Sequence, residues 1–180
     1  MNLRSLLSVG AFAGLAGCGT SANSTTSTGA TCVTTITNAV GANNTLQSIQ
    51  GGSASGDWSR STGLTIVCVT TAQALEVKVT GASPNAGVTY GVTSDPNAIG
   101  NVATVRYGET VKNANGSSGH VTCKGTAGTV KIDAAAKDTV SFTFSGVTAV
   151  VDPDSSQNLA TGTMTLAGSG RVDDLLGFAP

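Results

Sequence analysis

The clearest pattern in the chain is an alternation of apolar and polar residues with a period of two. Val140, Phe142 and Phe144 alternate with serine and threonine. Successive side chains of a β-strand point to opposite faces, so this stretch predicts a strand with one buried face. The segment around Met164 and Leu166 repeats the pattern, and we expect it to form the return strand.

Shorter segments of β-branched and alternating residues begin at residue 32 and are separated by turn residues. Ser83–Gly87 and Asp95–Asn97 are two of these separators. Proline fixes φ, and glycine and asparagine tolerate positive φ, so such segments suit chain reversal. Thr45–Gln50 is instead predicted as a short helix. The predicted strands are Cys32–Ile36, Leu64–Thr70, Ala74–Thr80, Gly87–Thr93, Val102–Tyr107, His120–Lys124, Thr129–Asp133, Thr139–Val151 and Thr161–Val172.

The composition agrees with an all-β domain. Charged residues make up 11% of the chain, roughly half the usual share. Long helices normally carry Glu/Lys pairs on their solvent face, and Glu76 and Glu109 are the only glutamates. We therefore expect one all-β domain at residues 32–180, folded as an antiparallel β-sandwich or an open barrel.

The charge distribution argues against binding to nucleic acid. The formal net charge is −1 at pH 7, and the lysines are spread among turns and strands. Displacing counterions from phosphates needs a concentrated basic face, and so does binding to anionic lipid headgroups. We therefore expect no nucleic-acid partner.

The first 17 residues resemble an export signal. Arg4 precedes a mostly apolar run, Leu6–Ala16, which is shorter than the roughly 20 residues that span a bilayer. The run ends in Leu15-Ala16-Gly17-Cys18, which resembles the lipobox of bacterial lipoproteins. The resemblance implies cleavage between Gly17 and Cys18 and attachment of lipid, including palmitate-type acyl chains, to Cys18. The alternative is a plain secretory leader with a chance cysteine.

Residues 18–31 are predicted to be the lipidated N-terminus and a flexible tether. Gly19–Thr31 contains no charge and no large apolar side chain that could repay the entropy of ordering. Two acyl chains anchor a protein stably, whereas one binds reversibly. The expected location is the extracytoplasmic side of the cell membrane or of an outer membrane. Position 19 is Gly rather than the Asp that favours inner-membrane retention in enteric-type bacteria, so an outer-membrane location is permitted.

This arrangement of lipobox, tether and single β-domain resembles the small mycobacterial lipoprotein antigens. Short sequence segments are similar at Ile66–Ala72, Leu75–Val79, Gly81-Ala82 and Gly100–Val102. They consist of common strand and turn residues, and the chain departs from the family by an extra cysteine and by lacking a terminal cysteine. The resemblance implies a surface-exposed, non-catalytic domain that faces the envelope or a host.

Lipidation of Cys18 would leave Cys32, Cys68 and Cys123. Export permits a disulfide, and three pairings are open. Loop-closure entropy does not choose among them, because Cys32–Cys68 and Cys68–Cys123 would each contribute roughly 4 kcal/mol. Cys68–Cys123 is slightly preferred, since both residues lie in predicted strands while Cys32 adjoins the tether. Three buried free thiols are the remaining alternative.

Residues suited to catalysis or metal binding are scarce. His120 is the only histidine, which excludes a metal site built on several imidazoles. Ser117 and Ser118 lie near it without the Gly-x-Ser-x-Gly motif, so we interpret them as loop residues. Cys123 is three positions from His120 and should point to the opposite face of a strand. We expect no catalytic residue, no metal and no cofactor.

Oxygen-bearing side chains stand at alternate positions of one loop, as in calcium-binding loops. They are Asp152, Asp154, Ser156 and Asn158. Gln157 and Thr163 stand where such a loop carries glycine and glutamate, so an ordinary hairpin turn is the preferred interpretation.

The favoured functional hypothesis is a membrane-anchored lipoprotein of the cell envelope with a non-catalytic binding or structural role and an unknown ligand. One alternative is an envelope-polymer hydrolase that uses paired carboxylates such as Asp152 and Asp154. Another is a carrier of a small lipid or hydrophobic ligand. Trp58, in a polar stretch, is either an exposed binding anchor or an apolar plug at one end of the fold.

Overall fold

The structure is a computed structural model that describes residues 30–37, 46–80, 84–112, 116–152, 163–173 and 175. These residues form β-strands joined by turns and loops, without a helix. The strands are β1 (Thr31–Thr37), β2 (Ile49–Ser59), β3 (Gly63–Val69), β4 (Gln73–Thr80), β5 (Thr89–Val92), β6 (Val102–Lys112), β7 (Ser118–Ala136), β8 (Thr139–Val151) and β9 (Thr163–Val172).

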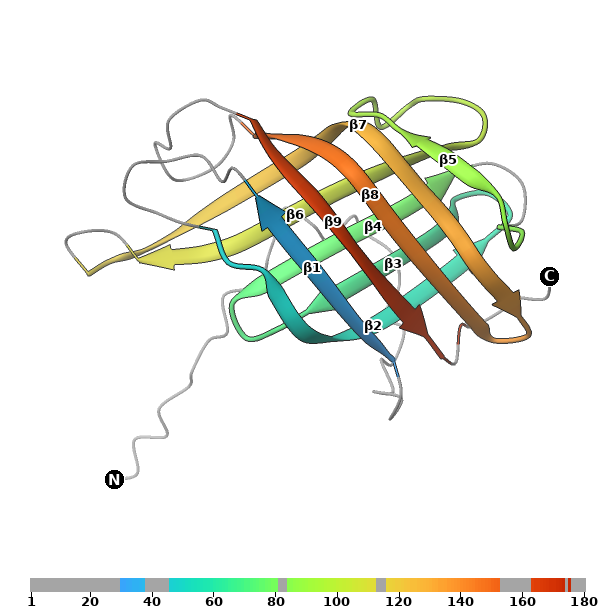
Figure 1. Ribbon diagram of the computed structural model, residues 1–180, viewed down its shortest axis with the longest axis horizontal. Coiled ribbons are helices and arrows are strands. Elements are labelled where there is room, and N and C mark those ends of the chain that lie inside the picture. Colours follow the sequence, from blue (N-terminus) through green and yellow to red (C-terminus); the bar gives the residue numbers. More distant parts are fainter. Residues whose placement is uncertain are drawn as a thin grey trace, which may run out of the picture.

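The strands form one sheet that closes into a barrel in the order β1-β2-β3-β4-β6-β5-β7-β8-β9 (Figure 1). Neighbouring strands are antiparallel except for the short β5–β6 pair, and β6 also pairs directly with β7. The all-β prediction is confirmed. The sheet is neither split into a sandwich nor left open, because β1 pairs with β9 along all of Thr31–Thr37. An alternating sequence predicts strands, but it does not show which strands are partners.

Two local predictions are wrong. Thr45–Gln50 does not form a helix in its described part, Leu46–Gln50, where Ile49 begins β2. The rest of β2 is missing from the predicted strands because its sequence, rich in glycine and serine, shows little apolar alternation. His120–Lys124 and Thr129–Asp133 belong to one long strand, β7, whose pairing with β8 is interrupted by register shifts around Gly125–Thr129.

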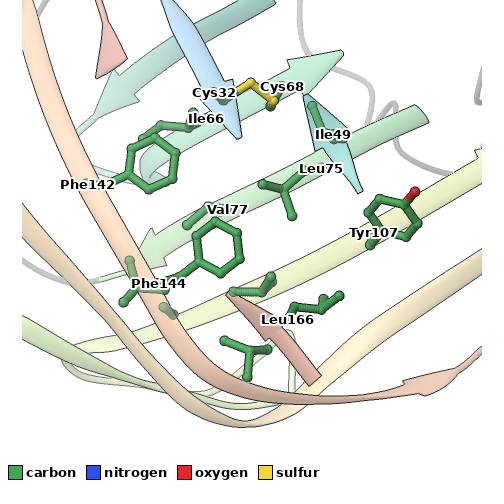
Figure 2. Packing of buried hydrophobic residues seen from close by; sticks show 14 of the residues in the cluster. Cys32, Ile49, Ile66, Cys68, Leu75, Val77, Tyr107, Phe142, Phe144 and Leu166 are labelled. Atoms are coloured by element: carbon green, nitrogen blue, oxygen red, sulfur yellow. A yellow bond between two sulfur atoms is a disulfide. The ribbon is translucent and has the colours of Figure 1, made fainter. Parts of the chain in front are cut away.

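The barrel interior contains a continuous apolar core (Figure 2). Val140, Phe142 and Phe144 point inward as predicted, each with an exposed fraction of 1% or less. Phe142 and Phe144 pair in register with Gly170 and Gly168 of β9. A Cβ atom on Gly168 or Gly170 would lie only 2.6 or 2.7 Å from the nearest ring atom, so the glycines leave the space that the two rings occupy.

The described fold begins and ends against this core. Ala30 is buried and Thr31 starts β1, so the described residues begin two positions before the predicted domain boundary. The predicted tether overlaps the described residues at Ala30 and Thr31, and its residues 18–29 lie outside them. Leu175 is fully buried, and its N–H donates to Asp138 O at 2.8 Å. Within the described residues, no helix is long and apolar enough to cross a membrane.

Candidate functional site: a buried carboxylate at one end of the barrel

The disulfide joins Cys32 and Cys68, and the preferred pairing Cys68–Cys123 is wrong (Figure 2). Cys123 is a buried free thiol on β7. From β3 to β7 the path around the sheet crosses β4 and β6, about 14 Å at three strand spacings, whereas disulfide Cα atoms lie within about 7 Å. Sequence alone could not show this separation because it does not give the strand order.

The bridge spans the intervening strand β2. Cys32 lies opposite Gly52, and Cys68 lies opposite Ala54. A Cβ atom on Gly52 would stand 3.1 Å from the Cys32 sulfur and 3.0 Å from the Cys68 sulfur, so the disulfide passes over the bare glycine. The β1–β2 register shifts beside Cys32, and such irregularities bend strands. The two Cα atoms approach to 6.1 Å.

A polar cluster lies at the end of the barrel where β4 begins and β6 ends, which we call the carboxylate end. Its members are Gln47, Gln73, Tyr107 and Glu109. Val105, Tyr107, Glu109 and Val111 all belong to the inward face of β6, and Glu109 is only 6% exposed. A carboxylate therefore stands where an apolar residue would continue the core.

The cluster binds both backbone polar groups of Gln47. The Gln47 N–H donates to Glu109 Oε2 at 2.8 Å. The Gln47 carbonyl accepts from the Tyr107 hydroxyl at 2.6 Å and from Gln73 Nε2 at 2.8 Å. The Tyr107 hydroxyl also lies 2.7 Å from Glu109 Oε2. These contacts hold the segment that leads into β2 against the beginning of β4 and the end of β6.

Burial governs the electrostatics of this end. It raises the pKa of Tyr107, and the hydrogen bond and negative charge of Glu109 raise it further, against a lowering contribution from Gln73. Burial also raises the pKa of Cys123 to about 12, with smaller contributions from the charges of Glu109 and Asp152. Both groups are therefore neutral at physiological pH, and Cys123 is not an activated nucleophile.

Asp152 lies among charged residues that project outward from the sheet. Its carboxylate is 3.7 Å from Arg106 Nη2 and 3.9 Å from Lys124 Nζ. Arg106 also faces Glu76 across the β4–β6 pair. Burial raises the pKa of Glu76, while the charges of Arg106 and Lys78 oppose that shift. Asp152 is thus balanced by two cations on the outer face, whereas Glu109 faces the interior.

The other residues considered from sequence are dispersed. His120 is partly exposed and pairs with Thr110, while Cys123 points inward from the opposite face of β7. Ser117 and Ser118 are exposed. Trp58 is partly buried and packs against the core, which agrees with the plug interpretation. Among the described residues, no three His, Cys, Asp or Glu side chains gather closely enough to hold a metal ion.

Several predicted sites fall outside the described residues. They are Gly17 and Cys18 at the lipobox and Asp154, Ser156 and Asn158 in the loop after β8. The lipidation and calcium hypotheses therefore stay predictions.

Sequence reasoning did not single out Glu109 as a buried group. The signal that could have found it is the alternation of residues 103–111, which places Glu109 in phase with Val105 and Tyr107 on the apolar face. The predicted strand ends at Tyr107, so it leaves out Glu109, the next position on the inward face. The participation of Gln47 and Gln73 required knowledge of the topology.

Comparison with protein-family models, curated proteins and solved structures found no match to this chain. The resemblances to lipoproteins and to the mycobacterial antigens therefore remain predictions from the sequence.

Proposed function

We propose that the chain is a membrane-anchored bacterial lipoprotein whose β-barrel has a non-catalytic binding or structural role on the extracytoplasmic side. The observation that carries the proposal is Leu15-Ala16-Gly17-Cys18 at the end of a short apolar run. The Cys32–Cys68 bridge supports it independently, because structural disulfides are typical of oxidising compartments outside the cytoplasm.

The environment of Glu109 and Asp152 supports a non-catalytic role. Glu109 Oε2 accepts a backbone N–H and lies against the Tyr107 hydroxyl. Asp152 faces two cations outside the barrel. Paired-carboxylate hydrolysis requires two carboxyl groups that face one substrate, and these two occupy different faces of the sheet. No described contact favours the hydrolase or the carrier over the proposed role.

Metabolic labelling tests the anchor. The full-length chain is expressed in a bacterial host with radiolabelled palmitate, alongside Cys18→Ser and Cys123→Ser variants. We expect label in the wild type and in Cys123→Ser, and a loss of both label and membrane association in Cys18→Ser. Cys123→Ser is the matched control because it removes one thiol outside the lipobox and the disulfide. Equal labelling of all three proteins, or no labelling of any, would contradict the proposal.

A further inference from the structure

The disulfide lies where the chain enters the barrel. Thr31 is the first residue of β1, and Cys32 is the second. If Cys18 carries lipid, the tether ends directly before this point, so any tension between the membrane and the barrel enters β1 at its first residues. This source of tension rests on the proposed function, whereas the position of the bridge does not.

β1 without the bridge would be the weakest part of that connection. It pairs with β9 along its whole length, but its register with β2 covers only Thr31–Thr34 and shifts beside Cys32. Terminal segments held by few contacts open locally at low free energy. A pull on Thr31 would load the first pairs of β1 and detach the strand, which would also remove the closure between β1 and β9.

The bridge gives the load a different path. Cys68 lies in β3, which pairs with β2 over Gly63–Val69 and with β4 over Leu64–Val69. A strand paired along both edges over nearly its whole length resists removal better than β1, whose pairing with β2 covers only Thr31–Thr34. The bridge also passes over Gly52, so β2 lies between the two strands that it joins.

We propose that Cys32–Cys68 is a load-bearing clamp between the membrane tether and the barrel. Tension that reaches residue 32 passes through the sulfur atoms to β3, and β1 remains paired with β9. The clamp allows a barrel with a terminal strand next to its anchor to stay closed under tension at the cell surface.

Single-molecule pulling tests the clamp. Handles are attached at residue 18 and at the C-terminus of the mature chain, with the handle in place of lipid. The wild type, a Cys32→Ala/Cys68→Ala variant and a Cys123→Ala control are stretched without reductant. We expect the wild type and Cys123→Ala to unfold in one main rupture.

In the double variant, an earlier step at lower force should release the 7 residues of β1, about 25 Å of contour length. Complete unfolding should release more chain than in the wild type, because the bridge closes a segment with a sequence separation of 36. The difference is about 120 Å at 3.3–3.6 Å per residue.

An early release of about 25 Å in the oxidised wild type that is absent from a control pull between Asn97 and the C-terminus would overturn the clamp, and so would a double variant without such a step. The wild-type measurement alone decides the question if the double variant does not fold. The control pull bypasses the bridge and should give the same first rupture with and without it. Failure of the clamp leaves palmitate labelling unchanged, and a lack of labelling leaves the pulling result unchanged, so the two proposals fail separately.

Discussion

The two ends of the barrel are closed in different ways. The end where β9 finishes, which we call the plug end, is closed by apolar packing: Leu175 and Val172 fill the space above Gly56, where an added Cβ atom would lie 2.7 Å from Leu175. The carboxylate end is closed by hydrogen bonds: Tyr107 and Gln73 donate to the Gln47 carbonyl, and the Gln47 N–H donates to Glu109. Apolar burial is non-directional and stabilises in proportion to area, whereas buried hydrogen bonds contribute a modest net stabilisation and are costly when one partner is lost.

The two ends should therefore contribute differently: apolar packing contributes mainly to stability, and the hydrogen bonds mainly fix the backbone geometry. The plug end should supply more of the folding free energy, because Leu175 is fully buried. The carboxylate end should fix where the segment before β2 lies, because three side chains hold the backbone N–H and C=O of Gln47. The carboxylate end is therefore the better candidate for a binding site that needs a fixed backbone geometry. Tyr107 and Cys123, whose pKa values are raised, also lie at this end.

The largest expected effect is at the plug end. Leu175→Ala removes a fully buried side chain beside Gly56 and leaves a cavity, which should lower the free energy of unfolding by about 2–5 kcal/mol. Chemical denaturation monitored by far-UV circular dichroism measures the change. A loss below that range would show that Leu175 merely covers the end.

Tyr107→Phe should have a smaller and more local effect. The variant removes the hydroxyl donor to the Gln47 carbonyl and the contact with Glu109, at a cost of about 1–3 kcal/mol. Hydrogen exchange should accelerate mainly at the Gln47 amide, which donates to Glu109 Oε2, because its segment loses the Tyr107 hydroxyl as a partner. Uniform acceleration of hydrogen exchange over the whole barrel would contradict a local role of the Tyr107 hydroxyl.

Alkaline pH should weaken the carboxylate end. Burial raises the pKa of Cys123 to about 12, so its stabilising contribution is complete below the ordinary value near 9 and is lost as pH rises toward 12. At pH 10, one unit above that ordinary value, the loss from this thiol is on the order of 1 kcal/mol. Cys123→Ala should therefore flatten the fall in stability between pH 9 and 10. An unchanged slope would argue against this coupling.

The smallest effect is expected from Asp152→Asn. Its contacts with Arg106 and Lys124 are 3.7 and 3.9 Å long, and both cations are about one-third exposed. Asp152 itself is buried, with an exposed fraction of 8%, but ion pairs this long to cations that reach solvent contribute about 0–1 kcal/mol, so the melting temperature should change little. A large loss would assign Asp152 a structural role that these distances do not indicate.

The sequence predicted the strands whose inward positions carry large apolar side chains. In β8, Val140, Phe142 and Phe144 make the alternation plain. It missed β2 because the inward positions there are small: Gly52 lies under the disulfide, and Gly56 lies under Leu175. Those residues are small in order to accommodate partners that are distant in sequence.

The same limit applies to the candidate site. The alternation around Tyr107 and Glu109 carries enough information to place both inside the barrel. Their shared partner Gln47 is separated from Tyr107 by 60 positions in the chain, and only the topology brings them together. The disulfide follows the same rule, since loop-closure entropy treats the two pairings alike and strand order distinguishes them.

Lipid on Cys18 should anchor the protein, while the Cys32–Cys68 bridge joins β1 to β3. Intact-mass spectrometry of the unreduced protein extracted from membranes tests this arrangement most directly. We predict a chain that begins at Cys18, carries lipid on that residue, and is lighter by the two hydrogens lost to the Cys32–Cys68 bond. A chain that retains Met1–Gly17, or one with an unmodified Cys18, would contradict the account.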